Sequence, residues 1–248
     1  MVITSRTNPI VKTVRTLHRS KGRAETGLHF IEGDKLVRDA MASGAVLDTV
    51  FAVEGTEFAA EQTAVLVSAS VMEAMATVQT PQTAAATVVT PSLRVPDRYP
   101  NGLIVALDRI QDPGNLGTIL RTADALGASA VLLSADSCDP FSPKALRAAM
   151  GSTYHLPIFV GELPEELDRL GAQGYQCICG HLSGEEQLPK HQRDTVIVIG
   201  NEGNGVSEAV AERCVRYRMP MRGRAESLNA AIFGALMMQR YFWEEDRI

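Results

Sequence analysis

The chain has 248 residues, of which 45% are hydrophobic, so it can bury a sizeable core in one large domain or two modest ones. Its formal net charge of -5 at pH 7 argues against a protein that coats nucleic acid indiscriminately. The sequence has no run of about 18 or more apolar residues and no recognisable signal peptide, so we expect a cytoplasmic protein with no membrane partner.

The N-terminal segment is basic, because residues 1–23 contain six basic and no acidic side chains. Such a cluster fits either a grip on a phosphate backbone or the solvated face of a helix. Its members are Arg6, Lys12, Arg15, Arg19, Lys21 and Arg23.

Up to residue 89, apolar periodicity predicts a small mixed α/β unit in which nothing looks catalytic. Three prolines without periodicity mark residues 90–101 as an extended linker, so we expect two domains, residues 1–95 and 96–248. The elements expected in the first are helices near residues 8–19, 35–42 and 71–76, and strands near 28–31, 47–53, 64–67 and just before 89.

After the linker, short apolar runs alternate with mostly helical segments, which predicts an α/β domain with a parallel sheet covered on both faces. In such sheets, ligands bind at the carboxyl ends of the strands. The expected strands are residues 103–107, 130–133, 156–160, 175–179 and 196–199.

The first expected strand of this sheet runs into Asp112-Pro-Gly-Asn-Leu-Gly117, a turn in which Asn115 can cap a helix that extends to about residue 126. Arg121 of that helix should lean back toward the turn. An arginine aimed at exposed backbone amides suits an anionic or partly anionic substrate, although a lone helical arginine is commonly just solvated.

The four cysteines show no Cys-x-x-Cys spacing, and a chain of this length needs no disulfide framework, so we expect reduced thiols. Cys177 and Cys179 share a face of an expected strand with His181. That arrangement fits a metal cluster or, more commonly, buried core cysteines, and we predict no metal site.

A second motif, Gly200-Asn-Glu-Gly-Asn-Gly205, directly follows the strand expected at residues 196–199. Glycine and asparagine free the backbone to take positive φ and to pass close to a ligand, and Glu202 is the one charged group. The motif is neither a dinucleotide fingerprint nor a phosphate loop. A plain turn is the alternative, but it does not account for the glutamate.

The third motif, residues 219–229, joins two methionines and two arginines to Ser227 and Asn229 at the expected start of the last helix. Helix capping alone would explain Ser227 but not its neighbours. Methionines and leucines can form a slot for an adenine ring. The segment also continues an acid-free run of arginines that begins at Arg213 and suits a phosphate backbone.

The last helix, expected over residues 227–243, is apolar nearly all round its circumference, so it should be buried nearly all round. We expect one face to meet the sheet and the other to meet a second subunit. A central position in the core of a monomer is the alternative.

In order, spacing and identity, the three motifs resemble those of the SpoU-TrmH family of RNA ribose 2′-O-methyltransferases, in the SPOUT superfamily, over roughly the last three-fifths of the chain. The resemblance implies a deep trefoil knot in the α/β parallel-sheet domain, S-adenosylmethionine as cofactor, and a homodimer with active sites at its interface. Residues 30–38 also resemble the opening of the family's small α/β RNA-binding domain.

Carried over to this chain, the resemblance implies distinct cofactor and catalytic residues. Met219 stands where isoleucine is frequent in the family. The residues implied to contact the cofactor are Gly200, Met219 and Leu228, and those implied to form the catalytic set are Asn115, Arg121, Glu202, Ser227 and Asn229.

The implied reaction is methyl transfer to a ribose 2′-hydroxyl of structured RNA. Since a guanidinium cannot accept a proton, we expect Arg121 to bind the hydroxyl or a phosphate, with Glu202 orienting Arg121 or sharing proton transfer. The N-terminal domain favours ribosomal RNA over transfer RNA, because the compact transfer-RNA enzymes of the family often lack one. The alternatives are a non-catalytic RNA-binding or ribosome-assembly protein and a nucleotide-dependent enzyme, against which the absent fingerprint counts.

Overall fold

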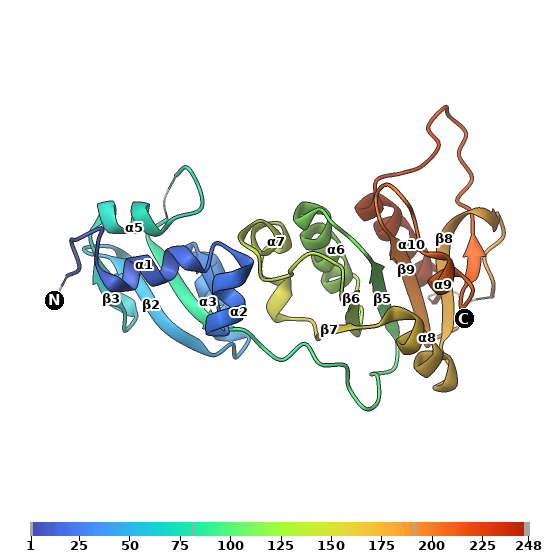
Figure 1. Ribbon diagram of the computed structural model, residues 1–248, viewed down its shortest axis with the longest axis horizontal. Coiled ribbons are helices and arrows are strands. Elements are labelled where there is room, and N and C mark those ends of the chain that lie inside the picture. The colour runs from blue at the N-terminus through green and yellow to red at the C-terminus, as the bar shows by residue number, and fades with distance from the viewer. Residues whose placement is uncertain (1, 81, 191, 246–248) are drawn as a thin grey trace.

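The computed structural model describes residues 2–80, 82–190 and 192–245, and the chain forms two β-sheets side by side along its longest axis (Figure 1). The elements before the linker are α1 (Pro9–Thr16), α2 (Ser20–Thr26), β1 (Leu28–Glu32), α3 (Asp34–Ala42), β2 (Leu47–Val53), α4 (Glu57–Glu61), β3 (Val65–Val67), α5 (Ala69–Met75) and β4 (Ala84–Val89). Their strands form a mixed sheet in the order β1-β4-β2-β3.

The helix expected near residues 8–19 is α1, which ends earlier, at Thr16, and α2 is a second helix that was not predicted. Asn8 caps α1, because its Oδ1 accepts the amide of Ile10 at 2.9 Å. The chain then turns into α2, which crosses the end of α1 at Gly22, where a Cβ atom would lie 2.2 Å from the carbonyl oxygen of Thr16. The other expected elements of this region are confirmed within two residues, whereas the short α4, like α2, was not predicted.

The second sheet follows the linker and confirms the predicted parallel arrangement. Its strands lie in the order β10-β8-β9-β5-β6-β7, and neighbouring strands pair in parallel. Its elements are β5 (Leu103–Asp108), α6 (Pro113–Ala125), β6 (Ala130–Ser134), α7 (Pro143–Ala149), β7 (Ile158–Gly161), α8 (Leu163–Ala172), β8 (Gln176–Glu185), β9 (Thr195–Gly200), α9 (Glu208–Ala211), β10 (Val215–Tyr217) and α10 (Ala230–Glu245).

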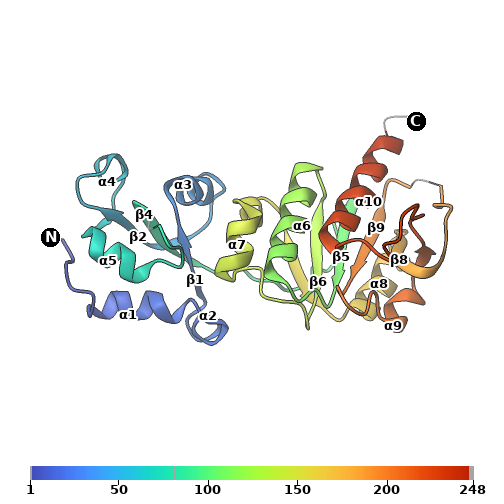
Figure 2. The same ribbon diagram turned by 90° about the horizontal axis from the view of Figure 1, so that it is seen from above.

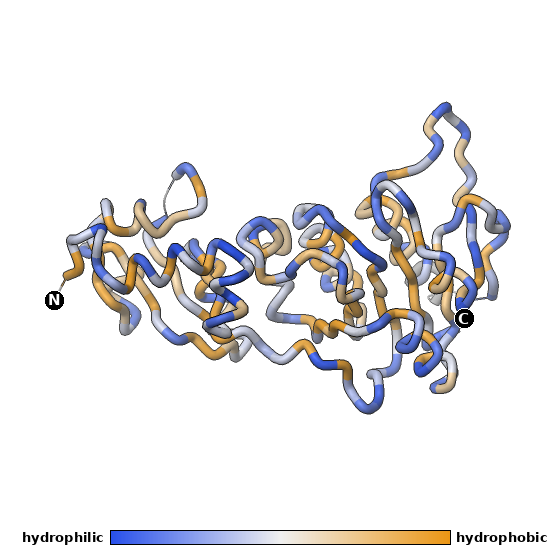
Figure 3. Tube along the Cα trace, viewed as in Figure 1, coloured by the Kyte–Doolittle hydropathy of each residue, from blue (hydrophilic) through white to orange (hydrophobic). Residues whose placement is uncertain are grey.

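Helices cover both faces of this sheet (Figure 2). Leu103, Val105 and Leu107 of β5 point into a core shared with α6 and α10, whereas Ile104 and Ala106 point into a core shared with α8 and α9. The strands accordingly run as largely hydrophobic traces in Figure 3. Within the residues described, no helix is long and apolar enough to cross a membrane.

The cysteines of β8 are core residues, as expected. Cys177 is 8% exposed and Cys179 is fully buried, and both pack in the core beside α8 and α9. Burial raises the pKa of the Cys177 thiol to about 11, so it stays neutral. Among the described residues, no three His, Cys, Asp or Glu side chains are grouped so that they could hold a metal ion.

The linker is extended, as expected, but it is anchored to the second sheet. The amide of Val160 in β7 donates to the carbonyl oxygen of Leu93 at 2.7 Å. Tyr99 is 2% exposed, and its hydroxyl donates to Glu166 of α8 at 2.7 Å. The linker therefore belongs to the core of the second sheet and is not a loose tether.

The N-terminal sheet is docked against α7, which lies between it and α6 in both views (Figures 1 and 2). Arg23, 7% exposed, pairs with Asp139 at 2.6 Å. The fully buried ring of His29 hydrogen-bonds to the Tyr154 hydroxyl at 2.7 Å and lies tilted against the Phe141 ring, with the ring centroids 4.6 Å apart. Burial, assisted by the charge of Arg23, lowers the pKa of His29 to about 3. The contact is thus made by buried, specifically paired side chains.

Candidate active site

The loop after β5 leads into α6, and its cap differs from the one expected. Asp112, not Asn115, caps the helix, because its Oδ1 accepts the amide of Asn115 at 2.9 Å. Its other oxygen accepts from Lys144 Nζ of α7 at 2.6 Å. These hydrogen bonds, that of Lys144 foremost, lower the pKa of the Asp112 carboxyl. Because Asp112 is the cap, the Asn115 side chain is available for other contacts.

Glu202, in the loop after β9, binds back to the loop after β5. Its Oε1 accepts from Asn115 Nδ2 at 3.0 Å and from the Asp112 amide at 3.2 Å, while its Oε2 accepts from the Gln111 amide at 3.3 Å. Partial burial acts to raise the pKa of Glu202, but these hydrogen bonds outweigh it, and the pKa is lowered. Glu202 is therefore an ionised acceptor at neutral pH.

Asn229 connects the third motif to this pair. Its Nδ2 donates to Asn115 Oδ1 at 3.0 Å, and its Oδ1 accepts the amides of Ala231 and Ile232 at 2.9 and 3.3 Å. The expectation that Ser227 starts the last helix is wrong, since Asn229 caps α10, which begins at Ala230. One chain of side-chain hydrogen bonds, Glu202 to Asn115 to Asn229, thus joins all three motifs.

A cavity of about 780 Å³ lies beside this chain. It is bounded by the end of β8, the loop after β9, and the segment between β10 and α10. All three residues expected to contact a cofactor line it, and so do two of the expected catalytic residues. These five are Gly200, Met219, Leu228, Glu202 and Ser227.

Sequence reasoning missed part of the cavity wall. Gly180 and His181 of β8 line it, as does Phe233 of α10, whose ring lies where a Cβ on Gly180 would meet it at 2.4 Å. The rule that ligands bind at the carboxyl ends of parallel strands would have pointed to Gly180 and His181. Phe233 carries no local signal, because its position depends on how α10 returns across the sheet.

Arg121 stands apart from the other expected catalytic residues. It is exposed on α6, does not line the cavity, and has no hydrogen-bond or ion-pair partner among the described residues. Glu202 binds Asn115 and two backbone amides, and no hydrogen bond or ion pair joins it to Arg121 in the described residues, so its expected role in orienting Arg121 stays a prediction. Arg121 lies seven residues after Gly114, two helical turns along the same face.

The arginine-rich run beside the third motif is mostly paired. Arg213 and Arg218 bind Asp168 and Glu186 at 2.9 and 2.7 Å, and Arg216 pairs with Glu208. Arg222 and Arg224 are exposed on the long loop between β10 and α10 and have no ion-pair partner in the described parts of the chain. Arg218 is the member of this run that lines the cavity, so within those parts the unpaired positive charge lies on the loop beyond the cavity wall.

Comparison with known proteins agrees with this geometry. Residues 102–239, more than half of the chain, match the model of the SpoU rRNA Methylase family. The chain belongs to the SpoU rRNA methylase family. Residues 8–86 of this family member match the MRM3-like substrate binding domain.

Similarity to individual SpoU proteins extends over nearly the whole chain. The chain is 33% identical over 244 residues to the 23S rRNA (guanosine(2553)-2′-O)-methyltransferase RlmP of Bacillus subtilis, covering 95% of this chain and 97% of that one. The structure of an AdoMet-bound rRNA methyltransferase from Sinorhizobium meliloti superposes with a TM-score of 0.88 at 35% identity, covering 97% of both chains. The fold of nearly the whole chain, both sheets included, is therefore shared with that solved structure.

Proposed function

We propose that this protein transfers the methyl group of S-adenosylmethionine to a ribose 2′-hydroxyl of RNA, with ribosomal RNA favoured over transfer RNA. The observation that carries the proposal is the hydrogen-bonded chain from Glu202 through Asn115 to Asn229 at the edge of the large cavity. Full-length similarity to proteins named as rRNA methyltransferases supports ribosomal RNA as the substrate. Such a substrate implies work in the cytoplasm.

The residues present fit S-adenosylmethionine. A cavity of about 780 Å³ suits a ligand of this size. Ile199, Met219 and Phe233 offer apolar surface for an adenine ring, and the glycines of the loop after β9 let the backbone approach it closely. The ionised Glu202 at the cavity suits a ligand that carries a positive sulfonium. When bound, the cofactor supplies a methyl group activated by that positive sulfur.

The chain's own residues then have to place and stabilise the ribose. We assign Asn115 and Asn229 to holding the two loops in register, since each side chain is already fixed by the other. Arg121 is free to bind the RNA near the reacting hydroxyl and to stabilise its oxygen as the proton leaves. Ser227, exposed at the cavity wall, is available to the substrate.

We further propose a homodimer formed through α10. Ile232 and Leu236, one turn apart, are 52% and 44% exposed, which is unusual for large apolar side chains on a helix that otherwise packs on the sheet. Because α10 is capped by Asn229 and packs on α6, such an interface would lie beside the site and the exposed Arg121. A dimer also accounts for a helix that is apolar nearly all round.

The remaining assignments concern the architecture. We propose that residues 1–95 are an RNA-binding domain and residues 96–248 the methyltransferase domain, which the two matched family models support. We also propose that the C-terminal segment threads a trefoil knot, as the resemblance implies. The return of residues 226–233 to the loop after β9, after the excursion through β10, is compatible with such threading.

The test is labelled methyl transfer to purified RNA. Methyl-labelled S-adenosylmethionine is incubated with the protein and, separately, with deproteinised ribosomal and transfer RNA, and the label is mapped by nuclease digestion and mass spectrometry. We expect label on a ribose of ribosomal RNA. Arg121→Ala should abolish transfer and leave cofactor affinity nearly unchanged, whereas Arg121→Lys, which keeps the charge, should retain part of the activity.

The result also separates the alternative function. A non-catalytic ribosome-assembly protein would bind the cofactor and RNA without labelling either pool or a pre-assembled ribosomal particle. A large loss of cofactor affinity in Arg121→Ala would contradict the position assigned to Arg121, since that side chain does not line the cavity.

A further inference from the structure

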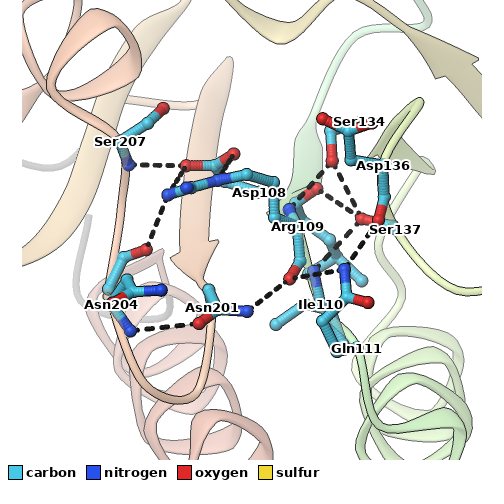
Figure 4. A network of polar contacts seen from close by, with 12 residues as sticks. Asp108, Arg109, Ile110, Gln111, Ser134, Asp136, Ser137, Asn201, Asn204 and Ser207 are labelled. Carbon is cyan, nitrogen blue, oxygen red and sulfur yellow. Dashed lines mark hydrogen bonds and ion pairs between the residues drawn. The ribbon is translucent and has the colours of Figure 1, made fainter.

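Arg109, the first residue after β5, has a backbone conformation that non-glycine residues rarely adopt. Its φ is 57°, in the left-handed region, which is unfavourable for a side chain with a Cβ. Such a conformation persists only where the surroundings fix it. Here they do, because the Arg109 amide donates to Ser134 Oγ at 2.8 Å and its carbonyl oxygen accepts from Asn201 Nδ2 at 2.8 Å (Figure 4).

The side chain of Arg109 reaches back to the loop after β9. Its Nε donates to Asp108 Oδ1 at 3.1 Å, and one terminal nitrogen donates to the carbonyl oxygen of Gly205 at 3.3 Å. Asp108 is 3% exposed, and its second oxygen accepts the amide of Ser207 at 2.6 Å. Asp108 and Arg109 thus hold the far end of the loop, while the Arg109 carbonyl holds its beginning at Asn201.

The loop between these anchors is closed on itself. Asn201 and Gly205 exchange backbone hydrogen bonds of 3.0 and 2.9 Å, and Asn201 Oδ1 accepts the amides of Gly203 and Asn204. Glu202 lies in this closed turn, from which it reaches Asn115. Any movement of the anchors would therefore move Glu202 and the cavity wall together.

We propose that Arg109, with Asp108, is a positioning residue that fixes the loop 201–205 in the shape required to bind S-adenosylmethionine. Neither residue lines the cavity, so both act through the loop. The inference rests on the proposed function only in naming the ligand. It goes beyond the three motifs, because no role for Arg109 was expected from the sequence.

Three substitutions of Arg109 distinguish the effect of its guanidinium from the effect of its unfavourable backbone conformation. Arg109→Ala removes the guanidinium and keeps the unfavourable φ. Arg109→Gly removes the guanidinium and relieves the φ, so it should fold even if the alanine variant does not. Arg109→Lys keeps the charge but not the planar fork that spans Asp108 and Gly205. Arg38→Ala is the matched control, because Arg38 likewise bridges two partners, the carboxylates of Asp34 and Glu61, but lies in the N-terminal part of the chain.

The affinity for S-adenosylmethionine is measured by calorimetry, and the KM for the cofactor and kcat by methyl transfer. We expect both Arg109→Ala and Arg109→Gly to weaken cofactor binding about tenfold, the effect of one ordinary hydrogen bond, and to raise KM more than they lower kcat. The cofactor affinity of Arg109→Lys should lie between that of these two variants and that of the wild type, and Arg38→Ala should bind the cofactor as tightly as the wild type. RNA affinity should be unchanged in the three Arg109 variants.

A glycine variant that binds the cofactor as tightly as the wild type would overturn the inference, because the guanidinium would then be dispensable. An equal loss in Arg38→Ala would overturn it too, since the effect would be one of general stability. Absence of cofactor binding by the wild-type protein would instead contradict the proposed function.

Discussion

Gly200, the last residue of β9, offers a direct test of whether the loop after β9 shapes the cofactor cavity. A Cβ atom at this position would lie 2.2 Å from the Val206 amide nitrogen and 2.3 Å from the carbonyl carbon of Gly205. Both are backbone atoms, so neither can rotate away. To reach ordinary contact at 3.4 Å, the loop in Gly200→Ala must shift by about 1.2 Å.

The expected size of the effect follows from that shift. Overpacking of this kind costs about 1–3 kcal/mol. If the cost falls on returning the loop to the shape that binds S-adenosylmethionine, the dissociation constant rises by about 5- to 140-fold. Gly203→Ala in the same loop is the control, because the nearest atom to its new Cβ would be Asn201 Oδ1 at an unstrained 3.6 Å.

The assay is calorimetric titration of both variants with S-adenosylmethionine, together with their thermal unfolding. Gly203→Ala should bind like the wild type. A folded Gly200→Ala protein with wild-type affinity would refute the reasoning, since the loop would then tolerate the shift without consequence for the cavity.

Other predictions address association, pH and RNA. Replacing Ile232 and Leu236 of α10 by aspartate should convert the proposed dimer to a monomer of unchanged fold, which light scattering and circular dichroism would detect; a wild-type monomer would contradict the dimer. Because the pKa of His29 is about 3 in the folded chain against 6.5 when unfolded, the unfolded chain binds the extra proton as pH falls below 6.5. The contribution of His29 to the free energy of unfolding is complete above pH 6.5 and should fall by about 2 kcal/mol at pH 5. The free energy of unfolding of His29→Gln, measured in urea, should therefore depend less on pH than that of the wild type. Alanine at the exposed Arg15 and Arg19 should weaken RNA binding and reduce its salt dependence by about one unit of slope for each phosphate that is no longer bound, and an unchanged slope would place the RNA elsewhere.

The sequence predicted most of what local patterns control. Apolar runs located nearly all strands of both sheets, and the glycine-rich motifs located the loops that line the cavity. Short elements were missed, because β10 has only three residues with an arginine in the middle, and such a run carries no periodicity.

The errors in the site come from competition between neighbouring polar residues. Asp112 and Asn115 can each cap a helix, as can Ser227 and Asn229, and sequence alone does not decide between them. In the structure, Asp112 caps α6, which leaves the Asn115 side chain to bridge Glu202 and Asn229. That bridge depends on three segments far apart in the chain, so no local pattern could have revealed it.

The buried contacts around α7 have a consequence for substrate choice. Arg23 with Asp139 and His29 with Tyr154 hold the N-terminal sheet at a set separation from the cavity. If that sheet binds RNA, the distance between the bound RNA element and the active site is fixed by these contacts. Only a ribose that lies at this distance from the bound RNA helix or loop then reaches the cofactor. The nucleotide is therefore selected by the distance between two points on the folded RNA and not by the identity of its base.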